Sequence, residues 1–231
     1  MGQSIEKLAI ERGHSIAGVI NVDNPNDLER FSRPSADVAI EFTQPEVAFD
    51  NISTCIRQGI PVISGTTGWL DKYQDVVDLC DQKEGTFLYA SNFSLGVNLF
   101  FKMNEWLGQL MSGHASYQPS IEETHHIHKK DAPSGTAITL AEGILKSFNR
   151  LKKWTLGLPS DNELLIKAIR KGEVPGTHSV KFRSQVDEIE IRHEAFSRQG
   201  FVLGAVLVAE WIKDQKGVLT MDDFMRSSSG L

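Results

Sequence analysis

Ile60-Pro61-Val62-Ile63-Ser64-Gly65-Thr66-Thr67-Gly68 is the stretch of sequence that decides the fold class. Its first five residues form a short apolar run typical of a buried strand, and a glycine ends the run at position 65. Similar runs occupy residues 38–42 and 86–90, and helical patterns over 45–58 and 70–81 separate the three runs. Apolar strands that alternate with helices indicate a parallel sheet covered on both faces. We therefore predict an α/β fold with a Rossmann-like dinucleotide-binding domain.

The start of the chain departs from the usual form of such a domain. A helical pattern over residues 5–9 is closed by Gly13, and the apolar run 16–20 is interpreted as a strand that ends at Asn21. A strand and a G-x-G-x-x-G loop normally precede that first helix. Met1-Gly2 stand where the loop would end, so we expect this chain to lack the first strand and the glycine loop.

After Phe93 the pattern changes to that of a second domain. Residues 179–183 and 188–192 alternate apolar and polar side chains, which is typical of half-buried strands in an antiparallel or mixed sheet. Helices are expected over 96–113, 134–148 and 202–213, and Gly217 is expected to end the last of them before a short acidic tail. We predict a dinucleotide-binding domain over 1–93 and 199–231, and an α+β domain with a mixed sheet over 94–198.

Composition narrows the class of protein. Of the 231 residues, 40% are hydrophobic and 23% are charged, which is the balance of a globular protein. No apolar run approaches the ~20 residues of a membrane-spanning helix, and the first residues lack the apolar core of a signal peptide. Cys55 and Cys80 stand alone and are expected to stay reduced, in a cytoplasmic protein. The net charge of −6 argues against a nucleic acid or an anionic membrane as the partner.

Two turns rich in glycine and polar residues follow predicted strands of the first domain, Gly65-Thr66-Thr67-Gly68 and Ala90-Ser91-Asn92-Phe93. In doubly wound folds, ligands bind beyond the carboxyl ends of the strands. Glycines let the backbone approach a ligand closely, and the hydroxyl and amide groups can hydrogen-bond ribose or carboxamide groups. The alternative, from spacing alone, is that both are ordinary turns between a strand and a helix.

The strongest local signal runs from Glu122 to Thr136, EETHHIHKKDAPSGT. Three of the chain's seven histidines and two lysines fall within residues 125–130 of an otherwise acidic protein. If this segment is extended, His125 and Lys129 point one way while His126 and His128 point the other.

A helix is expected to open at Pro133-Ser134, which leaves the backbone N–H groups of Gly135 and Thr136 free at its positive end. Such a helix end beside lysine and histidine suits a carboxylate, and histidine titrates near neutral pH, so it can transfer a proton. A solvated basic loop is one alternative. A zinc site is another, which Lys129 and Lys130 disfavour because they would repel a cation.

The segment His125-His126-Ile127-His128-Lys129-Lys130-Asp131-Ala132-Pro133-Ser134-Gly135-Thr136 closely resembles the signature of the bacterial dihydrodipicolinate reductase family, also called 4-hydroxy-tetrahydrodipicolinate reductase. A signature of this length with ordered companions is far more specific than a lone glycine motif. The resemblance covers nearly the whole chain. The companion segments, in the family's order, are residues 65–68, 92–98, 175–178, 192–198 and 204–206.

The resemblance implies reduction of 4-hydroxy-tetrahydrodipicolinate (dihydrodipicolinate) to tetrahydrodipicolinate with NADH or NADPH, in lysine and diaminopimelate biosynthesis. It implies that the first domain binds the cofactor, and that the second binds the small cyclic dicarboxylate and forms a homotetramer. The family's general acid falls on His125 and its catalytic lysine on Lys129, with substrate contacts at His126, Lys129, Gly135 and Thr136. No metal is implied. The implied cofactor-binding positions are Met1, Gly2, Asn21, Gly65, Thr66, Thr67, Ala90, Ser91, Asn92 and Phe93.

Two departures from the family pattern bear on the cofactor. Without the first strand and glycine loop, a protein that starts strictly at Met1 is expected to be poorly soluble or to bind nicotinamide cofactor at least about tenfold more weakly than one extended by about a dozen residues. Asn21 occupies the strand end at which many dinucleotide enzymes carry an acid for the adenosine ribose, and Asp23 could substitute for it. Dual use of NADH and NADPH is therefore expected. Two other hypotheses stay open: a non-catalytic dinucleotide- or dicarboxylate-binding homologue, and a zinc hydrolase built on the histidines.

Overall fold

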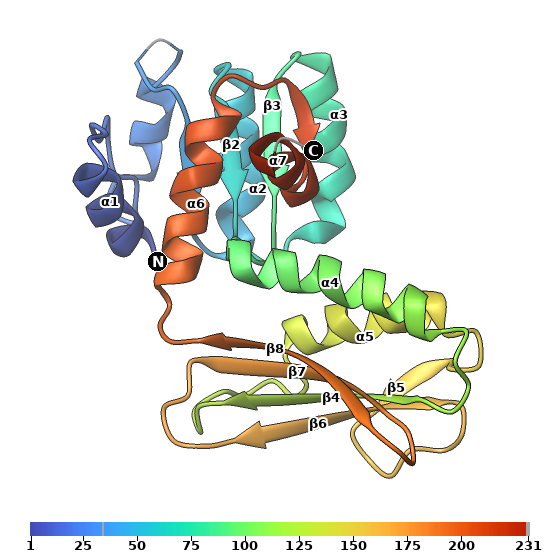
Figure 1. Ribbon diagram of the computed structural model, residues 1–231. Helices are drawn as coiled ribbons and strands as arrows, with labels where there is room; N and C mark the ends of the chain where they lie inside the picture. The colour runs from blue at the N-terminus through green and yellow to red at the C-terminus, as the bar shows by residue number, and fades with distance from the viewer. Residues whose placement is uncertain (34, 230–231) are drawn as a thin grey trace. The chain divides into compact units, whose positions relative to one another are not determined.

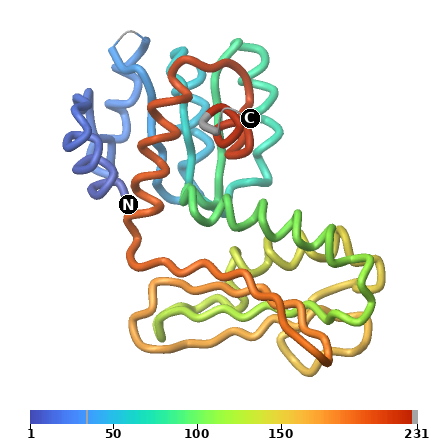
Figure 2. Tube along the Cα trace, in the orientation of Figure 1, coloured from blue at the N-terminus to red at the C-terminus, as the bar shows by residue number. Residues whose placement is uncertain are grey.

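The protein folds into two compact units, each built around a sheet of its own (Figure 1). The computed structural model describes residues 1–33 and 35–229. The first unit comprises Met1–Leu95 and the chain from Gln199 onward, and the second comprises Gly96–Arg198, so the chain leaves the first unit and later returns to it (Figure 2). No helix among the described residues is long and apolar enough to cross a bilayer.

The first unit contains a parallel sheet with the strand order β1-β2-β3-β9 in the described part of the chain. Ile40 of β1 lies opposite Ile63 of β2, which lies opposite Leu88 of β3. The predicted parallel sheet and α/β class are thereby confirmed. The strands are β1 (Ala39–Glu41), β2 (Val62–Ser64), β3 (Thr86–Tyr89) and β9 (Gly217–Leu219). The helices are α1 (Gly2–Glu11), α2 (Pro45–Arg57), α3 (Tyr73–Gln82), α6 (Gln199–Ile212) and α7 (Met221–Ser229), with short 3-10 helices at Pro25–Arg30 and Leu70–Lys72.

Two apolar cores cover the two faces of this sheet. Neighbouring residues of a strand point to opposite faces. Ile63 and Leu88 therefore enter one core with α1, α6 and α7, while Val62 and Phe87 enter the other with α2 and α3. All four side chains are fully buried. The strands read as unbroken apolar runs because both faces of the sheet exclude water.

One predicted strand of the first unit is wrong. Residues 16–20 pair with none of the described strands, and their side chains are mostly exposed. A strand is stable only where its N–H and C=O groups find a neighbouring strand. The apolar run has no such neighbour among the described residues, and it therefore stays irregular.

The predicted end of the chain is also wrong. α6 stops at Ile212, and Gly217, with a φ of +88°, begins β9 instead of ending a helix. The expected acidic tail folds into α7, whose Met221 and Phe224 are buried in the core that α6 shares. A three-residue strand is too short to show a period in the sequence, so the pattern could not reveal β9.

The second unit contains a mixed sheet, as predicted, with the order β5-β6-β4-β7-β8. β4 runs parallel to β6 and antiparallel to β7, and β7 runs antiparallel to β8. Side chains from one face of the sheet, such as Ile121 and Val180, share a core with α4 and α5. The elements are α4 (Leu95–Met111), β4 (Gln118–His125), α5 (Gly135–Ser147), β5 (Lys153–Thr155), β6 (Glu163–Arg170), β7 (Gly176–Arg183) and β8 (Glu188–Ala195).

Candidate functional site

A buried carboxylate stands at the centre of the candidate site in the second unit. Alternation along β4 places Ile121, Glu123 and His125 on the same, core-facing side of the sheet, and Glu123 has no exposed surface. Its Oε1 accepts hydrogen bonds from the backbone N–H of Ser134 (3.1 Å) and from Nη2 of Arg170 (3.2 Å). Sequence reasoning assigned no role to Glu123 or Arg170.

His125 approaches the other oxygen of this carboxylate. Its Nδ1 lies 3.0 Å from Glu123 Oε2, and both atoms are buried without another hydrogen-bond partner among the described residues. The two atoms lie within hydrogen-bond distance, but their directions depart from those of an ideal hydrogen bond. Burial alone would raise the pKa of Glu123, but the His125 imidazole and the Ser134 hydrogen bonds outweigh it and lower that pKa to about 2. The carboxylate is therefore ionised at neutral pH.

A second buried imidazole completes the group. The register of β4 and β7 places His178 opposite Glu123, and the rings of His125 and His178 meet edge to face at 5.0 Å. His178 Nε2 lies 3.2 Å from the hydroxyl of Ser134. Burial and then the neighbouring His125 lower the pKa of His178 to about 4, so this ring is neutral at pH 7.

The segment after His125 is not extended, so the predicted alternation of its side chains is wrong beyond that residue. β4 ends at His125, residues 127 and 128 form a turn, and the N–H of Lys129 donates to the carbonyl of His126 (3.2 Å). The strand ends there because its partner β6 ends at Arg170, after which the N–H of Lys171 caps the His125 carbonyl (2.8 Å).

Arg170 fastens the loop that carries Lys129. Its guanidinium donates to the carbonyls of Lys129 (3.3 Å) and Asp131 (2.5 Å) as well as to Glu123. The ammonium of Lys129 lies 2.8 Å from Asp131, and this pairing lowers the pKa of the Asp131 carboxyl. Arg170 thus holds the Lys129 loop and also binds Glu123, the residue that contacts His125.

The predicted helix opening is confirmed. Ser134 caps α5, its hydroxyl accepting from the N–H of Ala137 (3.2 Å), and Gly135 and Thr136 form the first turn. N–H groups of a first helical turn have no partner within the helix, so they can bind an anion. His126, the remaining substrate-binding candidate, has its ring 6.1 Å from that of His128.

Glu123, His125 and His178 each offer a possible metal-ligand atom, and these atoms lie within 4.8 Å of one another. The guanidinium of Arg170 already neutralises the carboxylate at 3.2 Å. A divalent cation beside this fixed positive charge would be repelled. We therefore assign no metal to the group.

The carboxyl ends of the parallel strands form the second candidate site. β1 ends at Glu41 and β2 at Ser64, so the segments that follow them lie along one edge of the sheet. Glu41 is buried and accepts from the hydroxyls of Ser64 (2.5 Å) and Thr66 (2.7 Å) and from the N–H of Thr43 (2.9 Å). Sequence reasoning missed Glu41, although an acidic residue at the end of an apolar strand is a visible signal.

The two predicted cofactor turns meet through aromatic side chains. A Cβ on Gly65 would lie 2.2 Å from the ring of Phe42, so only glycine allows this close approach. The Phe42 ring in turn packs against Phe93 at 5.6 Å. The structure therefore brings the turn at 65–68 and the turn at 90–93 together. These turns follow the carboxyl ends of β2 and β3, the edge at which doubly wound sheets bind dinucleotides, so their position fits a nicotinamide cofactor.

The other cofactor candidates lie elsewhere in the first unit. Gly2 is the first residue of α1, and Met1 precedes it. Asn21 does not end a strand, which corrects that expectation, because its Oδ1 accepts from the N–H of Asp23 (2.7 Å) in a tight turn. Asn21 is exposed and no described contact joins it to the turns at 65–68 and 90–93.

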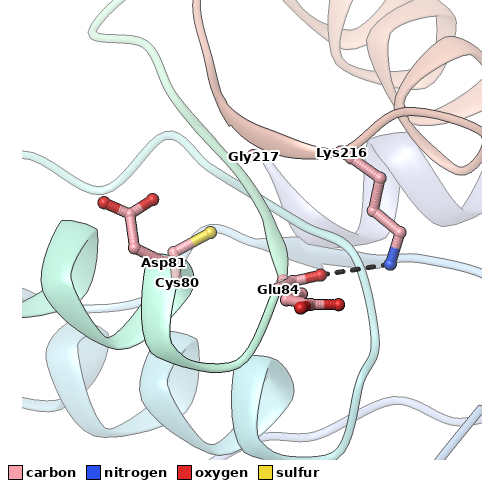
Figure 3. Close-up of a pocket in the computed structure, with 6 residues that line it drawn as sticks. Cys80, Asp81, Glu84, Lys216 and Gly217 are labelled. Carbon is pink, nitrogen blue, oxygen red and sulfur yellow. Dashed lines mark hydrogen bonds between the residues drawn. The ribbon is translucent and has the colours of Figure 1, made fainter.

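A cavity of about 330 Å³ lies at the opposite edge of the same sheet, where β3 and β9 begin (Figure 3). Lys216 reaches across it to the carbonyl of Glu84 (3.1 Å). Cys80 also lines the cavity, and burial raises the pKa of its thiol, which keeps the thiol neutral and unreactive. Ligands of parallel α/β sheets bind at the carboxyl edge, so we assign no role to this cavity.

Comparison with known proteins gives consistent matches over both units. Residues 1–93 match the family model described as dihydrodipicolinate reductase, N-terminus, and residues 96–225 match that described as dihydrodipicolinate reductase, C-terminus. The chain is 50% identical over 226 residues to 4-hydroxy-tetrahydrodipicolinate reductase of Christiangramia forsetii, covering 97% of this chain and 93% of the relative. It is 39% identical to the enzyme of that name from Archaeoglobus fulgidus, over 91% of this chain and 83% of the relative.

A solved structure agrees on the fold. It is that of dihydrodipicolinate reductase from Paenisporosarcina sp. TG-14 with dipicolinate bound, and it aligns with a TM-score of 0.69 at 22% sequence identity. The alignment covers 92% of this chain and 82% of that one.

Proposed function

This chain belongs to the dihydrodipicolinate reductase family, and from that premise we propose that it reduces 4-hydroxy-tetrahydrodipicolinate to tetrahydrodipicolinate with a nicotinamide cofactor. The reaction belongs to lysine and diaminopimelate biosynthesis. The relatives of this name cover more than nine-tenths of the chain at 50% and 39% identity, which supports the same activity here.

One observation carries the chemical part of this proposal. His125 is buried against the ionised carboxylate of Glu123, and the Lys129 loop and the start of α5 are tied to that same carboxylate through Arg170 and Ser134. A proton donor, a cation and free N–H groups are thus held by one network. Such a set suits a substrate that carries carboxylates and accepts a proton.

The residues of the second unit then have separate roles. His125 gives a proton to the substrate ring as the conjugated imine is reduced. Lys129, His126 and the N–H groups of Gly135 and Thr136 bind the two carboxylates and offset their charge. A bound nicotinamide supplies the hydride.

The residues of the first unit are proposed to hold that cofactor. The positions are Met1, Gly2, Asn21, Gly65, Thr66, Thr67, Ala90, Ser91, Asn92 and Phe93. The Gly65 turn and the Phe93 turn support this because Phe42 joins them and Glu41 fixes Thr66 at the carboxyl edge of the sheet.

We further propose that NADH and NADPH are both used. The proposed cofactor positions include neither an acid that would repel a 2′-phosphate nor an arginine that would attract one. A preference of about a hundredfold or more in kcat/KM for either cofactor would contradict this.

The protein is further proposed to be a cytoplasmic homotetramer. Two buried free cysteines support a reducing compartment. Exposed Leu99, Met103, Trp106 and Leu110 recur along one side of α4, and such an apolar surface favours contact between copies. Sedimentation of the purified protein measures the assembly.

The test of the function is His125→Gln, with His128→Gln as a matched control because His128 is exposed and lies in the same loop. Turnover of the first variant is expected to fall by about two to four decades, the usual contribution of a general acid, while NADH affinity stays unchanged. The control is expected to match wild type. Unchanged turnover of His125→Gln would remove His125 from the chemistry. Cofactor binding without any turnover in the wild type would instead favour the non-catalytic homologue.

A further inference from the structure

We propose that Glu123 is a positioning residue that turns His125 so that Nε2, rather than Nδ1, carries the transferred proton. This inference rests on the proposed function, in which His125 is the general acid. The facing atoms are Glu123 Oε2 and His125 Nδ1, 3.0 Å apart and buried, and neither has another hydrogen-bond partner in the described part of the chain. A buried carboxylate beside a buried imidazole nitrogen is satisfied only if that nitrogen carries a proton.

The other ring nitrogen faces a space kept open by a glycine. A Cβ on Gly176 would lie 3.1 Å from His125 Nε2 and 3.4 Å from Cδ2, tighter than ordinary contact. A side chain at this position of β7 would therefore cover the nitrogen. With Nδ1 turned to Glu123, Nε2 is the ring atom left to meet a substrate.

The carboxylate cannot turn to offer a different oxygen. Its Oε1 holds the N–H of Ser134 and the guanidinium of Arg170, which come from α5 and from the end of β6. These two contacts fix the carboxylate plane from two sides and leave Oε2 for the imidazole. His178 Nε2, 3.8 Å from the same Oε2, is engaged with the Ser134 hydroxyl at 3.2 Å.

The arrangement determines which tautomer the neutral ring adopts. With an ionised carboxylate at Nδ1, the neutral His125 holds its hydrogen on Nδ1, and the protonated ring gives up the hydrogen on Nε2. The same carboxylate stabilises the protonated ring before transfer. An amide in place of the carboxylate can donate a hydrogen bond to Nδ1, and the neutral ring then holds its hydrogen on Nε2. The Nε2–H of a neutral ring is a far weaker acid than the Nε2–H of a protonated ring.

The direct test uses the wild-type protein labelled with ¹⁵N histidine. Two-bond nitrogen–proton spectra distinguish the tautomers of a neutral imidazole, and the signals of His125 are those missing from His125→Gln. We expect the Nδ1–H tautomer for His125. The Nε2–H tautomer would overturn the proposal, whatever the variants do.

The kinetic test compares Glu123→Gln with Glu122→Gln. Glu122 is the next residue along β4, on the opposite face of the sheet, where it pairs with Lys167 (3.1 Å). Glu123→Gln is expected to invert the tautomer and to lower kcat by about 10²- to 10⁴-fold, with substrate KM and NADH affinity within about threefold of wild type. Glu122→Gln is expected to change neither.

Each failure has a different meaning. A folded Glu123→Gln variant with kcat within about threefold of wild type would overturn the positioning role. If Glu123→Gln does not fold, the wild-type tautomer decides alone. If His125→Gln keeps its turnover while His125 shows the Nδ1–H tautomer, His125 is not the general acid and the transfer from Nε2 is overturned, whereas the effect of Glu123 on the tautomer stands.

Discussion

Gly204→Ala is expected to disrupt the first unit, although it adds a single methyl group. Gly204 lies in α6 where the helix crosses the turn that follows β3. A Cβ at this position would lie 1.8 Å from the carbonyl oxygen of Phe93 and 2.7 Å from its carbonyl carbon. Both are backbone atoms, so no side-chain rotation relieves the contact, and the helix and the turn must separate by about 1.2 Å to reach even 3.0 Å.

The cost follows from the packing on either side. α6 contributes Val202, Ala205 and Val206 to the core beneath it, and these contacts loosen if the helix moves. Overpacking of this kind costs about 3 kcal/mol at the upper end of its usual range. For a chain of this size, that lowers Tm by about 10 °C. The Phe93 backbone also moves, so NADH binding is expected to weaken by about tenfold.

The assay is a paired thermal melt and NADH titration, with Gly200→Ala as the matched control. Gly200 lies in the first turn of the same helix, and its Cβ would lie 3.3 Å from the Ser94 hydroxyl, a side-chain atom. The control is expected to stay within about 1 kcal/mol of wild type, since alanine also favours the helix. A Gly204→Ala variant that melts within about 2 °C of wild type would refute the close approach of helix and turn.

Three further outcomes are expected. Lys129→Ala should raise substrate KM and lower kcat, together by about 1.5–3 kcal/mol, because a charge-assisted contact with a carboxylate is lost; both constants within about twofold of wild type would contradict its role. Glu41→Ala should lower Tm and weaken NADH binding, since the donors of Ser64, Thr66 and Thr43 lose their shared acceptor. Lower Tm with unchanged NADH affinity would confine Glu41 to stability. As pH falls from 6.5 to about 4, the free energy of unfolding should drop by up to about 1.4 kcal/mol per pH unit. The reason is that His178 takes up a proton in the unfolded chain but stays neutral when it is buried in the folded protein. Melting across this range shows the slope, which His178→Gln should flatten; an unchanged slope in that variant would assign it to other groups.

Local sequence predicted the elements whose identity lies in consecutive residues. The apolar runs at 60–64 and 86–90 became β2 and β3, and Pro133-Ser134 opened α5, because burial on both faces and helix capping leave their mark on neighbouring positions. At residues 16–20 the same kind of pattern predicted a strand that does not form. There the run is apolar, but a strand also needs a partner, and that depends on distant residues.

The candidate site likewise has residues that the sequence could predict and surroundings that it could not. His125 and Lys129 stand in one short segment, and their chemistry was visible from residue type and spacing. Their surroundings were not. Glu123 meets His178 only because β4 and β7 pair in one register, and a shift of β7 by one residue would turn His178 to the other face.

What the sequence by itself determined was the alternating pattern, the helix ends and the residues able to move a proton or bind a carboxylate. What only the tertiary structure decided was which ring nitrogen faces Glu123, how Arg170 closes the Lys129 loop, and how Glu41 gathers the hydroxyls at the sheet edge. The physical reason is the separation along the sequence over which each kind of interaction acts. Helix capping and side-chain alternation act between near neighbours, whereas hydrogen bonds to buried carboxylates join residues that strand register and helix packing bring together from far along the chain.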